Sequence, residues 1–75
     1  MFNPGDIVKF VDRSHADPWF NEHMKCIKDE ELFIVKKASK SGVTISTPEY
    51  TNLTLFSYRF KLIAKKTKFG YIVME

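Results

Sequence analysis

The sequence contains one cysteine, three glycines and three prolines among its 75 residues. A single cysteine cannot form an internal disulfide, which favours a reducing compartment. No apolar run approaches the roughly 20 residues that a membrane-spanning helix needs, and the first residues lack the basic-then-apolar pattern of a secretory signal. These absences predict a cytoplasmic protein without a membrane segment.

Sequence motifs for catalysis and metal binding are also absent. There is no glycine-rich phosphate loop, no serine nucleophile elbow and no His-Glu metal pair. His15, His23 and Cys26 do not have the spacing of a closed zinc site, and no local motif supplies a base to Cys26. The acidic run at residues 29–31 would alternate between faces if extended, which does not suit Mg²⁺. We therefore expect no enzyme activity, no metal and no cofactor.

Aromatic residues, by contrast, are abundant, with seven Phe, three Tyr and one Trp. A chain of this length buries only roughly 60% of its unfolded surface, so we expect one small domain over residues 1–75. Aromatic side chains bury a large area each and can supply its core. The predicted core consists of Val8, Phe10, Phe33, Val35, Val43, Ile45, Leu55 and Phe60, with Phe69 as a further filling residue.

Short runs of β-branched and aromatic residues, separated by turn residues, follow one another along the chain. A Pro4-Gly5-Asp6 turn, with Gly5 at positive φ, leads into a strand at about residues 6–12. Asp17-Pro18 is typical of a helix start and predicts a short helix or 3₁₀ turn over about residues 18–24 within a long loop. Further strands are expected at about residues 31–37, 43–47, 53–57 and 69–73. Residues 58–63 are expected to begin as a single 3₁₀ turn before the chain extends again.

Two features of these strands are specific predictions. The four consecutive apolar residues 32–35 predict burial on both faces, as in a tightly curved barrel. Gly42, in the turn before the third strand, is expected to adopt a positive φ. Five short strands with little helix predict an all-β fold closed into a small antiparallel barrel.

Three segments resemble small SH3-like barrels, including short proteins common in bacteriophage genomes: FNPGDIVKFVD, ELFIVKKASKSGVTIS and LTLFSYRFKLI. The resemblance covers about residues 2–63 and implies five strongly bent antiparallel strands and a binding role without catalysis. The opening Gly5-Asp6-Ile7-Val8 is also similar to the KOW-type barrels of transcription and ribosome factors. Those barrels have a glycine-rich loop after the first strand, whereas residues 13–30 here contain no glycine.

Charge is distributed unevenly along the chain. Residues 1–31 carry four cations and seven carboxylates, a net charge of −3, and residues 32–75 carry eight cations and two carboxylates, a net charge of +6. In one interpretation the lysines only keep strand edges soluble and unpaired. In the other, the basic half binds a polyanion. The candidate nucleic-acid-binding residues are Lys36, Lys37, Lys40, Arg59, Lys61, Lys65, Lys66 and Lys68.

A second candidate surface consists of aromatic residues beyond those that the core needs, namely Trp19, Phe20, Tyr50, Phe56, Tyr58 and Tyr71. Trp19 lies in the loop that SH3-like barrels use for binding, or else it plugs the open barrel end. The candidate protein-binding residues are Trp19, Phe20, Met24 and Tyr50. Aromatic residues among lysines also suit single-stranded nucleic acid, because bases stack on rings and phosphates meet charge.

Two hypotheses of different class follow from these surfaces. The first is a nucleic-acid-binding barrel that uses the basic residues. The second is a protein-interaction module, such as a small phage-type modulator of a host protein, that uses an aromatic groove. Polyanion binding falls steeply with ionic strength, while binding through an aromatic anchor does not. The charge asymmetry favours the first hypothesis.

Overall fold

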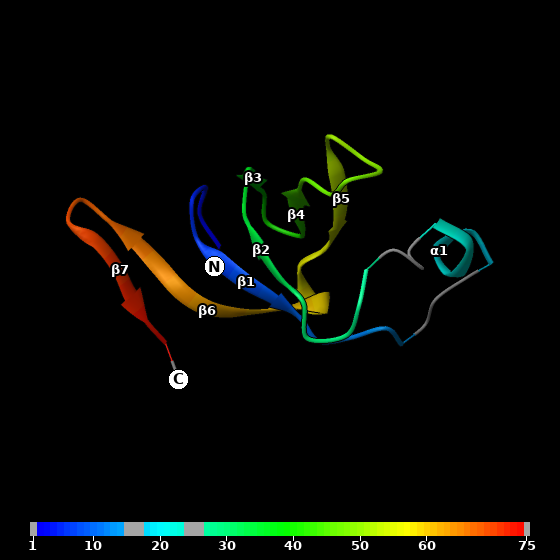
Figure 1. Cartoon of the computed structure of the whole chain (residues 1–75), viewed down its shortest axis with the longest axis horizontal. Helices are drawn as coiled ribbons and strands as arrows, with labels where there is room; N and C mark the ends of the chain where they lie inside the picture. Colours follow the sequence, from blue (N-terminus) through cyan, green and yellow to red (C-terminus); the bar gives the residue numbers. More distant parts are fainter. Residues whose placement is uncertain (1, 15–17, 24–26, 75) are drawn as a thin grey trace.

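The computed structural model of the chain describes residues 2–14, 18–23 and 27–74, except for the side chains of residues 19, 21 and 23. The elements within these residues are β1 (Ile7–Phe10), α1 (Pro18–His23), β2 (Leu32–Ile34), β3 (Lys37–Ala38), β4 (Gly42–Ile45), β5 (Leu53–Phe56), the 3₁₀ helix η1 (Ser57–Arg59), β6 (Phe60–Thr67) and β7 (Gly70–Val73). The strands form two antiparallel sheets of order β2-β1-β6-β7 and β3-β4-β5 (Figure 1).

The predicted all-β class is confirmed, but the architecture differs in detail from the prediction. The described residues form seven strands where five were expected. Strand pairing among them leaves the four-stranded and three-stranded sheets as two separate ladders and does not close a barrel. No helix in the described ranges is both long and apolar enough to cross a membrane.

The turn at the start of β1 fastens the N-terminal segment to β6. Gly5 has a φ of 94°, as expected, and its N–H donates to the carbonyl of Val35 at 2.8 Å. Asp6 is 1% exposed, and its carboxylate accepts the backbone N–H groups of Asn3 at 2.9 Å and Lys66 at 3.0 Å. Because β1 begins only at Ile7, the Asp6 side chain continues the β1–β6 pairing where the backbone ladder stops.

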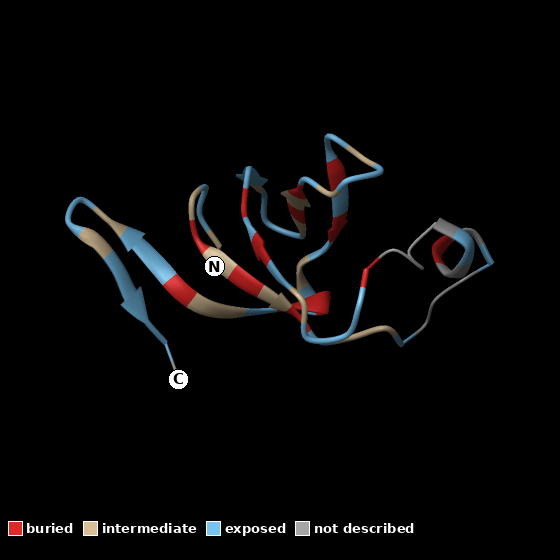
Figure 2. Cartoon of the chain, viewed as in Figure 1, coloured by how far each residue is buried: buried red, intermediate tan, exposed pale blue. Residues whose placement is uncertain are grey.

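The core is built from the inward-facing residues of both sheets (Figure 2). All eight predicted core residues are buried, and Phe20, Ile27 and Leu53 join them. Phe69, in contrast, is 98% exposed, so its assignment to the core was wrong. It lies in the turn between β6 and β7, and these strands extend beyond the part of β6 that pairs with β1. The tip of this hairpin therefore has no core to enter.

Two further strand predictions were wrong for identifiable reasons. Residues 32–35 alternate between exposed and buried, with Leu32 55%, Phe33 8%, Ile34 60% and Val35 2% exposed. β2 is an edge strand of its sheet, and only one of its faces meets the core. Gly42 is not among the described glycines with positive φ; it lies within β4, directly opposite Phe56 of β5. A Cβ at this position would lie 3.2 Å from Thr54 Cγ2, so glycine permits the close approach of β5.

The chain passes from one sheet to the other through η1, which lies where a 3₁₀ turn was expected. β6 then pairs with β1, with a register irregularity opposite Ile7 and Val8, and afterwards with β7. Overall dimensions are 41 × 24 × 22 Å, and the β6–β7 hairpin and α1 occupy opposite ends of the long axis (Figure 1). The fold thus presents the β6–β7 hairpin as a projection.

Candidate nucleic-acid interface

The seven candidate lysines are all exposed, and they fall into two groups. One group lies on β6 and the turn that follows it. The other lies on or beside β3 and its turn to β4. The members of the first group are Lys61, Lys65, Lys66 and Lys68, and those of the second are Lys36, Lys37 and Lys40.

The first group is concentrated on the projecting hairpin, residues 64–74, which we call the hairpin arm. The register pairs Lys65 with Ile72 and Lys66 with Tyr71, and consecutive strand residues point to opposite faces. The arm therefore carries cations on both faces. The ammonium of Lys66 lies 5.2 Å from the ring centroid of Tyr71. Residues 60–74 contain no acidic residue, so the local field is positive.

Hydrogen bonds close the tip and the base of the hairpin arm. At its tip, the Thr67 hydroxyl donates to the Gly70 carbonyl at 3.1 Å and accepts the N–H of Phe69 at 3.2 Å. At its base, the N–H of Met74 donates to the carbonyl of Ile63 at 2.7 Å. β7 is exposed along most of its length (Figure 2). The arm is therefore an ordered, accessible surface.

The lysines of the second group differ in what surrounds them. The ammonium of Lys36 donates to the carbonyl of Thr51 at 3.0 Å and to Asn52 Oδ1 at 2.8 Å, in the loop between β4 and β5. Lys37 pairs with Thr44 of β4, and direct cross-strand partners share one sheet face. Lys40 lies in the turn between β3 and β4 and lines an open pocket. The ammonium of Lys36 is thus already hydrogen-bonded within the protein.

Arg59 is not part of the exposed basic surface, which corrects its assignment to the nucleic-acid-binding set. It is 4% exposed, and its Nη1 donates to the carbonyls of Asp12 at 3.1 Å and Ser14 at 3.0 Å. Its guanidinium carbon lies 4.1 Å from the ring centroid of Phe20. The last residue of η1 therefore points inward and holds the loop after β1.

The aromatic set predicted to bind protein does not form an exposed groove in the described part of the chain. Phe20 is 5% exposed, and its ring stacks with that of Phe10 at a centroid distance of 6.4 Å. Tyr50 is half-buried and packs against the core. The side chain of Trp19 and all of Met24 lie outside the described residues. Phe20 thus belongs to the core.

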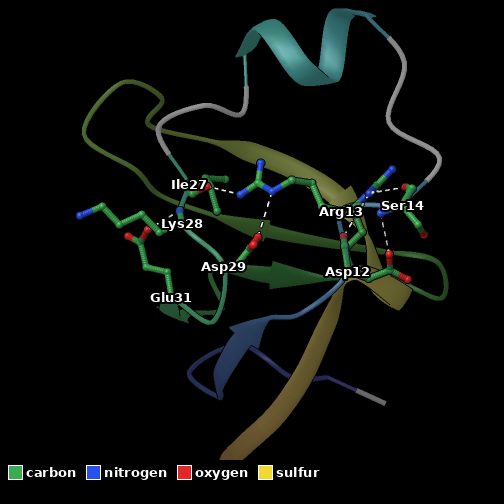
Figure 3. A network of polar contacts seen from close by, with 8 residues as sticks. Asp12, Arg13, Ser14, Ile27, Lys28, Asp29 and Glu31 are labelled. Carbon is green, nitrogen blue, oxygen red and sulfur yellow. Dashed lines mark hydrogen bonds and ion pairs between the residues drawn. The ribbon is translucent and has the colours of Figure 1, made fainter.

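Polar contacts at the base of the α1 segment use the acidic residues near position 30 (Figure 3). Arg13 Nε donates to Asp29 Oδ1 at 3.0 Å, and its Nη2 donates to the carbonyl of Ile27. Lys9 forms an ion pair with Glu30 at 3.6 Å, and Glu31 accepts the N–H of Lys28 at 2.9 Å. These contacts join the two ends of the segment that carries α1.

The described residues contain no group of three or more His, Cys, Asp and Glu side chains placed to hold a metal ion. His15, Cys26 and the side chain of His23 lie outside them.

Phe56, Tyr58 and Tyr71 are the exposed aromatic residues of the described chain that sequence reasoning counted as surplus but assigned to no site. Phe56 is 61% and Tyr58 49% exposed, and their rings are stacked with centroids 5.8 Å apart. The alternation in β5, which buries Leu53 and Leu55, was the available signal, because it directs Phe56 outward. The pair lies where β5 ends and η1 begins.

No known protein family, curated protein or solved structure matches the chain.

Proposed function

We propose that the chain is a non-enzymatic binding module that binds nucleic acid through the hairpin arm. The supporting observation is the arm itself, which carries Lys65 and Lys66 on opposite faces, Lys68 at its turn, and no acidic residue. Such a projection meets phosphates on either side, because each lysine is a point charge on a flexible stem. The exposed rings of Phe69 and Tyr71 add surfaces for stacking.

This mode of binding is independent of base sequence. Lysine contacts with phosphates release condensed counterions and supply affinity, but they carry no base information. The ordered hydrogen bonds at the tip and base of the arm support the proposal, because a preorganised surface loses less entropy when it binds. The arm then positions the nucleic-acid backbone so that other parts of the protein surface can contact it.

We also propose that the two sheets are an open form of the SH3-like barrel that the sequence resembles. β1 lies between β2 and β6, and η1 connects β5 directly to β6. The inward faces of both sheets share one core. These features support a relation to that barrel. The hairpin arm is then an addition beyond residue 63, where the resemblance ends.

The test is a fluorescence-anisotropy titration with single- and double-stranded oligonucleotides at low salt. The wild-type protein is expected to bind, and the double variant Lys65→Gln/Lys68→Gln to bind more weakly. The matched control is Lys9→Gln/Lys28→Gln, which removes the same charge from the β1–β2 region. Lys66 is left intact, because its side chain lies close to Gly5. Equal weakening in both variants would contradict a role for the arm and indicate a net-charge effect.

A protein-interaction module is the second candidate, and the observation that favours it is a set of exposed apolar side chains on β2 and β7. Leu32, Ile34, Ile72 and Val73 are 55–69% exposed. If no oligonucleotide binds at low salt, protein interaction remains as the candidate function. An affinity pull-down with and without nuclease then separates a partner held by protein contacts from one held through nucleic acid.

A further inference from the structure

The stacked rings of Phe56 and Tyr58 are held in place from within the protein. Their planes meet at 18°, and the guanidinium carbon of Arg59 lies 5.0 Å from the Tyr58 ring centroid. Arg59 is itself fixed by two backbone carbonyls and by the ring of Phe20. A series of contacting planar groups therefore runs from the core to the solvent. The exposed end of this series is oriented before any ligand arrives.

The outer face of the three-stranded sheet around Phe56 carries small and polar side chains. Opposite Phe56 lies Gly42, which has no side chain, and the next pair is Thr44 and Thr54, whose hydroxyl oxygens are 2.7 Å apart. Lys37 pairs with Thr44 and therefore lies on the same face. The face thus offers one exposed ring and one cation, with small side chains between them.

An open pocket of about 390 Å³ adjoins the ring of Tyr58. Its lining consists of Phe2, Ser39, Lys40, Ser57 and Tyr58. This volume is at the lower end of the range of about 300–1,000 Å³ that small-molecule sites occupy. Within the described residues, the ammonium of Lys40 makes no hydrogen bond or ion pair, in contrast to that of Lys36. The pocket therefore combines aromatic walls, three hydroxyl groups and a cation without a protein partner in the described part of the chain.

We infer that Phe56 and Tyr58 form a base-stacking subsite for single-stranded nucleic acid, with Lys37 and Lys40 contacting the phosphates on either side of the stacked base. This inference rests on the proposed nucleic-acid binding and specifies its form. A base in a duplex has both π-faces covered by its neighbours, so the rings select an unpaired strand. Two flanking ammonium groups favour a polyanion over an apolar or cationic peptide.

The experiment compares an intact oligonucleotide of about 10 nucleotides, a length within the range of single-strand sites, with the same backbone carrying abasic residues. The wild-type protein is expected to bind the abasic strand about 5- to 150-fold more weakly, the range that stacking of one base supplies. Phe56→Leu and Tyr58→Leu should show this loss with the intact strand and little further loss with the abasic one. Leu32→Ala, at another exposed apolar position, should bind both strands as the wild type does.

Two matched lysine variants test the phosphate contacts. Lys37→Gln and Lys36→Gln remove the same charge from adjacent positions, but only Lys37 shares a face with Phe56 and only Lys36 is bonded to Thr51 and Asn52. We expect Lys37→Gln to weaken binding several-fold more than Lys36→Gln. Equal effects of the two would overturn the placement of the strand on this face.

The outcomes separate this inference from the proposed function. If the wild-type protein binds intact and abasic strands equally while the arm variant is weakened, the arm functions and the stacking subsite is wrong. If the wild type binds neither strand at low salt, the proposed function itself fails. If a nucleoside monophosphate competes as well as the oligonucleotide at equal nucleotide concentration, the pocket is a free-nucleotide site and the strand assignment is overturned.

A measurement on the wild-type protein guards against a variant that fails to fold. An oligonucleotide containing the fluorescent base 2-aminopurine should lose emission on binding when that base stacks on the rings. Unchanged emission at every position of the probe along the strand would overturn the subsite without reference to any substitution.

Discussion

The guanidinium carbon of Arg59 lies 4.1 Å from the ring centroid of Phe20, although the two residues belong to η1 and α1. Arg59 Nη1 also donates to the carbonyls of Asp12 and Ser14 in the loop after β1. Phe20 in turn stacks on Phe10 of β1. One buried cation thus connects η1, the loop and α1 to the core.

Replacing Arg59 by lysine tests this connection. Lysine keeps the charge but lacks the planar group that stacks on Phe20 and the fixed donor geometry that reaches two carbonyls. We expect Arg59→Lys to lower the free energy of unfolding by about 2 kcal/mol, measured by urea denaturation. The comparison is Arg13→Lys, whose guanidinium carbon lies 4.9 Å from the Phe10 ring centroid but whose side chain is 34% exposed, so a smaller loss than at Arg59 is expected. Equal losses would contradict the connecting role of Arg59.

Phe10 is the residue of the core whose removal should matter most. It is fully buried, and its ring centroid lies 6.4 Å from that of Phe20 and 5.9 Å from that of Phe60. Phe10→Ala should cost about 3–5 kcal/mol, most of the stability of a domain this small. The neighbouring Val11 is 48% exposed, so Val11→Ala serves as the control. A thermal melt of Phe10→Ala within a few degrees of wild type would show that the core is placed wrongly.

The buried carboxylate of Asp6 gives a prediction about the attachment of the N-terminal turn. Its two oxygens accept the N–H groups of Asn3 and Lys66, whereas an asparagine side chain has only one acceptor oxygen. One backbone N–H would then face an NH₂ group, at a cost of about 1–3 kcal/mol. We expect Asp6→Asn to be destabilised by this amount and the Lys66 amide to exchange faster with solvent.

The control for that change is Asp29→Asn, whose carboxylate is 77% exposed and accepts from Arg13. An exposed ion pair contributes about 1 kcal/mol or less, so this variant should unfold close to wild type. Unchanged protection of the Lys66 amide in Asp6→Asn would mean that the carboxylate does not hold β6.

The parts of the fold that follow from local patterns could be predicted from the sequence. Alternation in β4 and β5 placed Val43, Ile45 and Leu55 inside, as the structure has them. The Pro-Gly-Asp turn and the positive φ of Gly5 follow from residue chemistry alone. Each of these predictions depends on neighbours within a few residues.

The predictions that failed depend on partners far away in the sequence. A run of four apolar residues does not reveal that only one face of β2 meets the core, so the exposure of Ile34 could not be read from it. Phe69 has the pattern of a core strand, but the hairpin extends past the core. Arg59 lies in a basic half of the chain, yet its partners come from α1 and the loop after β1. Residue type alone therefore assigned both Phe69 and Arg59 to the wrong environment.

The salt dependence of binding gives a prediction that separates the lysines from one another. On a single strand, the logarithm of the binding constant changes with the logarithm of salt concentration by roughly −0.7 for each phosphate contacted. Lys65→Gln/Lys68→Gln removes two such cations, so the slope should flatten by about 1.4. The loss should be the same for all base sequences, because phosphate contacts carry no base information. Anisotropy titrations at several salt concentrations measure the slope.

Lys37 in β3 and Lys36 directly before it make the comparison sharper. Lys37→Gln should flatten the slope by about 0.7, the value for one phosphate. The ammonium of Lys36 is already bonded to Thr51 and Asn52, so Lys36→Gln should change the slope much less. If the lysines only protect exposed strand edges, every variant would keep the wild-type slope and the arm variant would aggregate more readily. If instead all variants flatten the slope equally for each charge removed, the protein attracts the nucleic acid through its overall positive charge. Neither the arm nor the face around Phe56 then holds the strand.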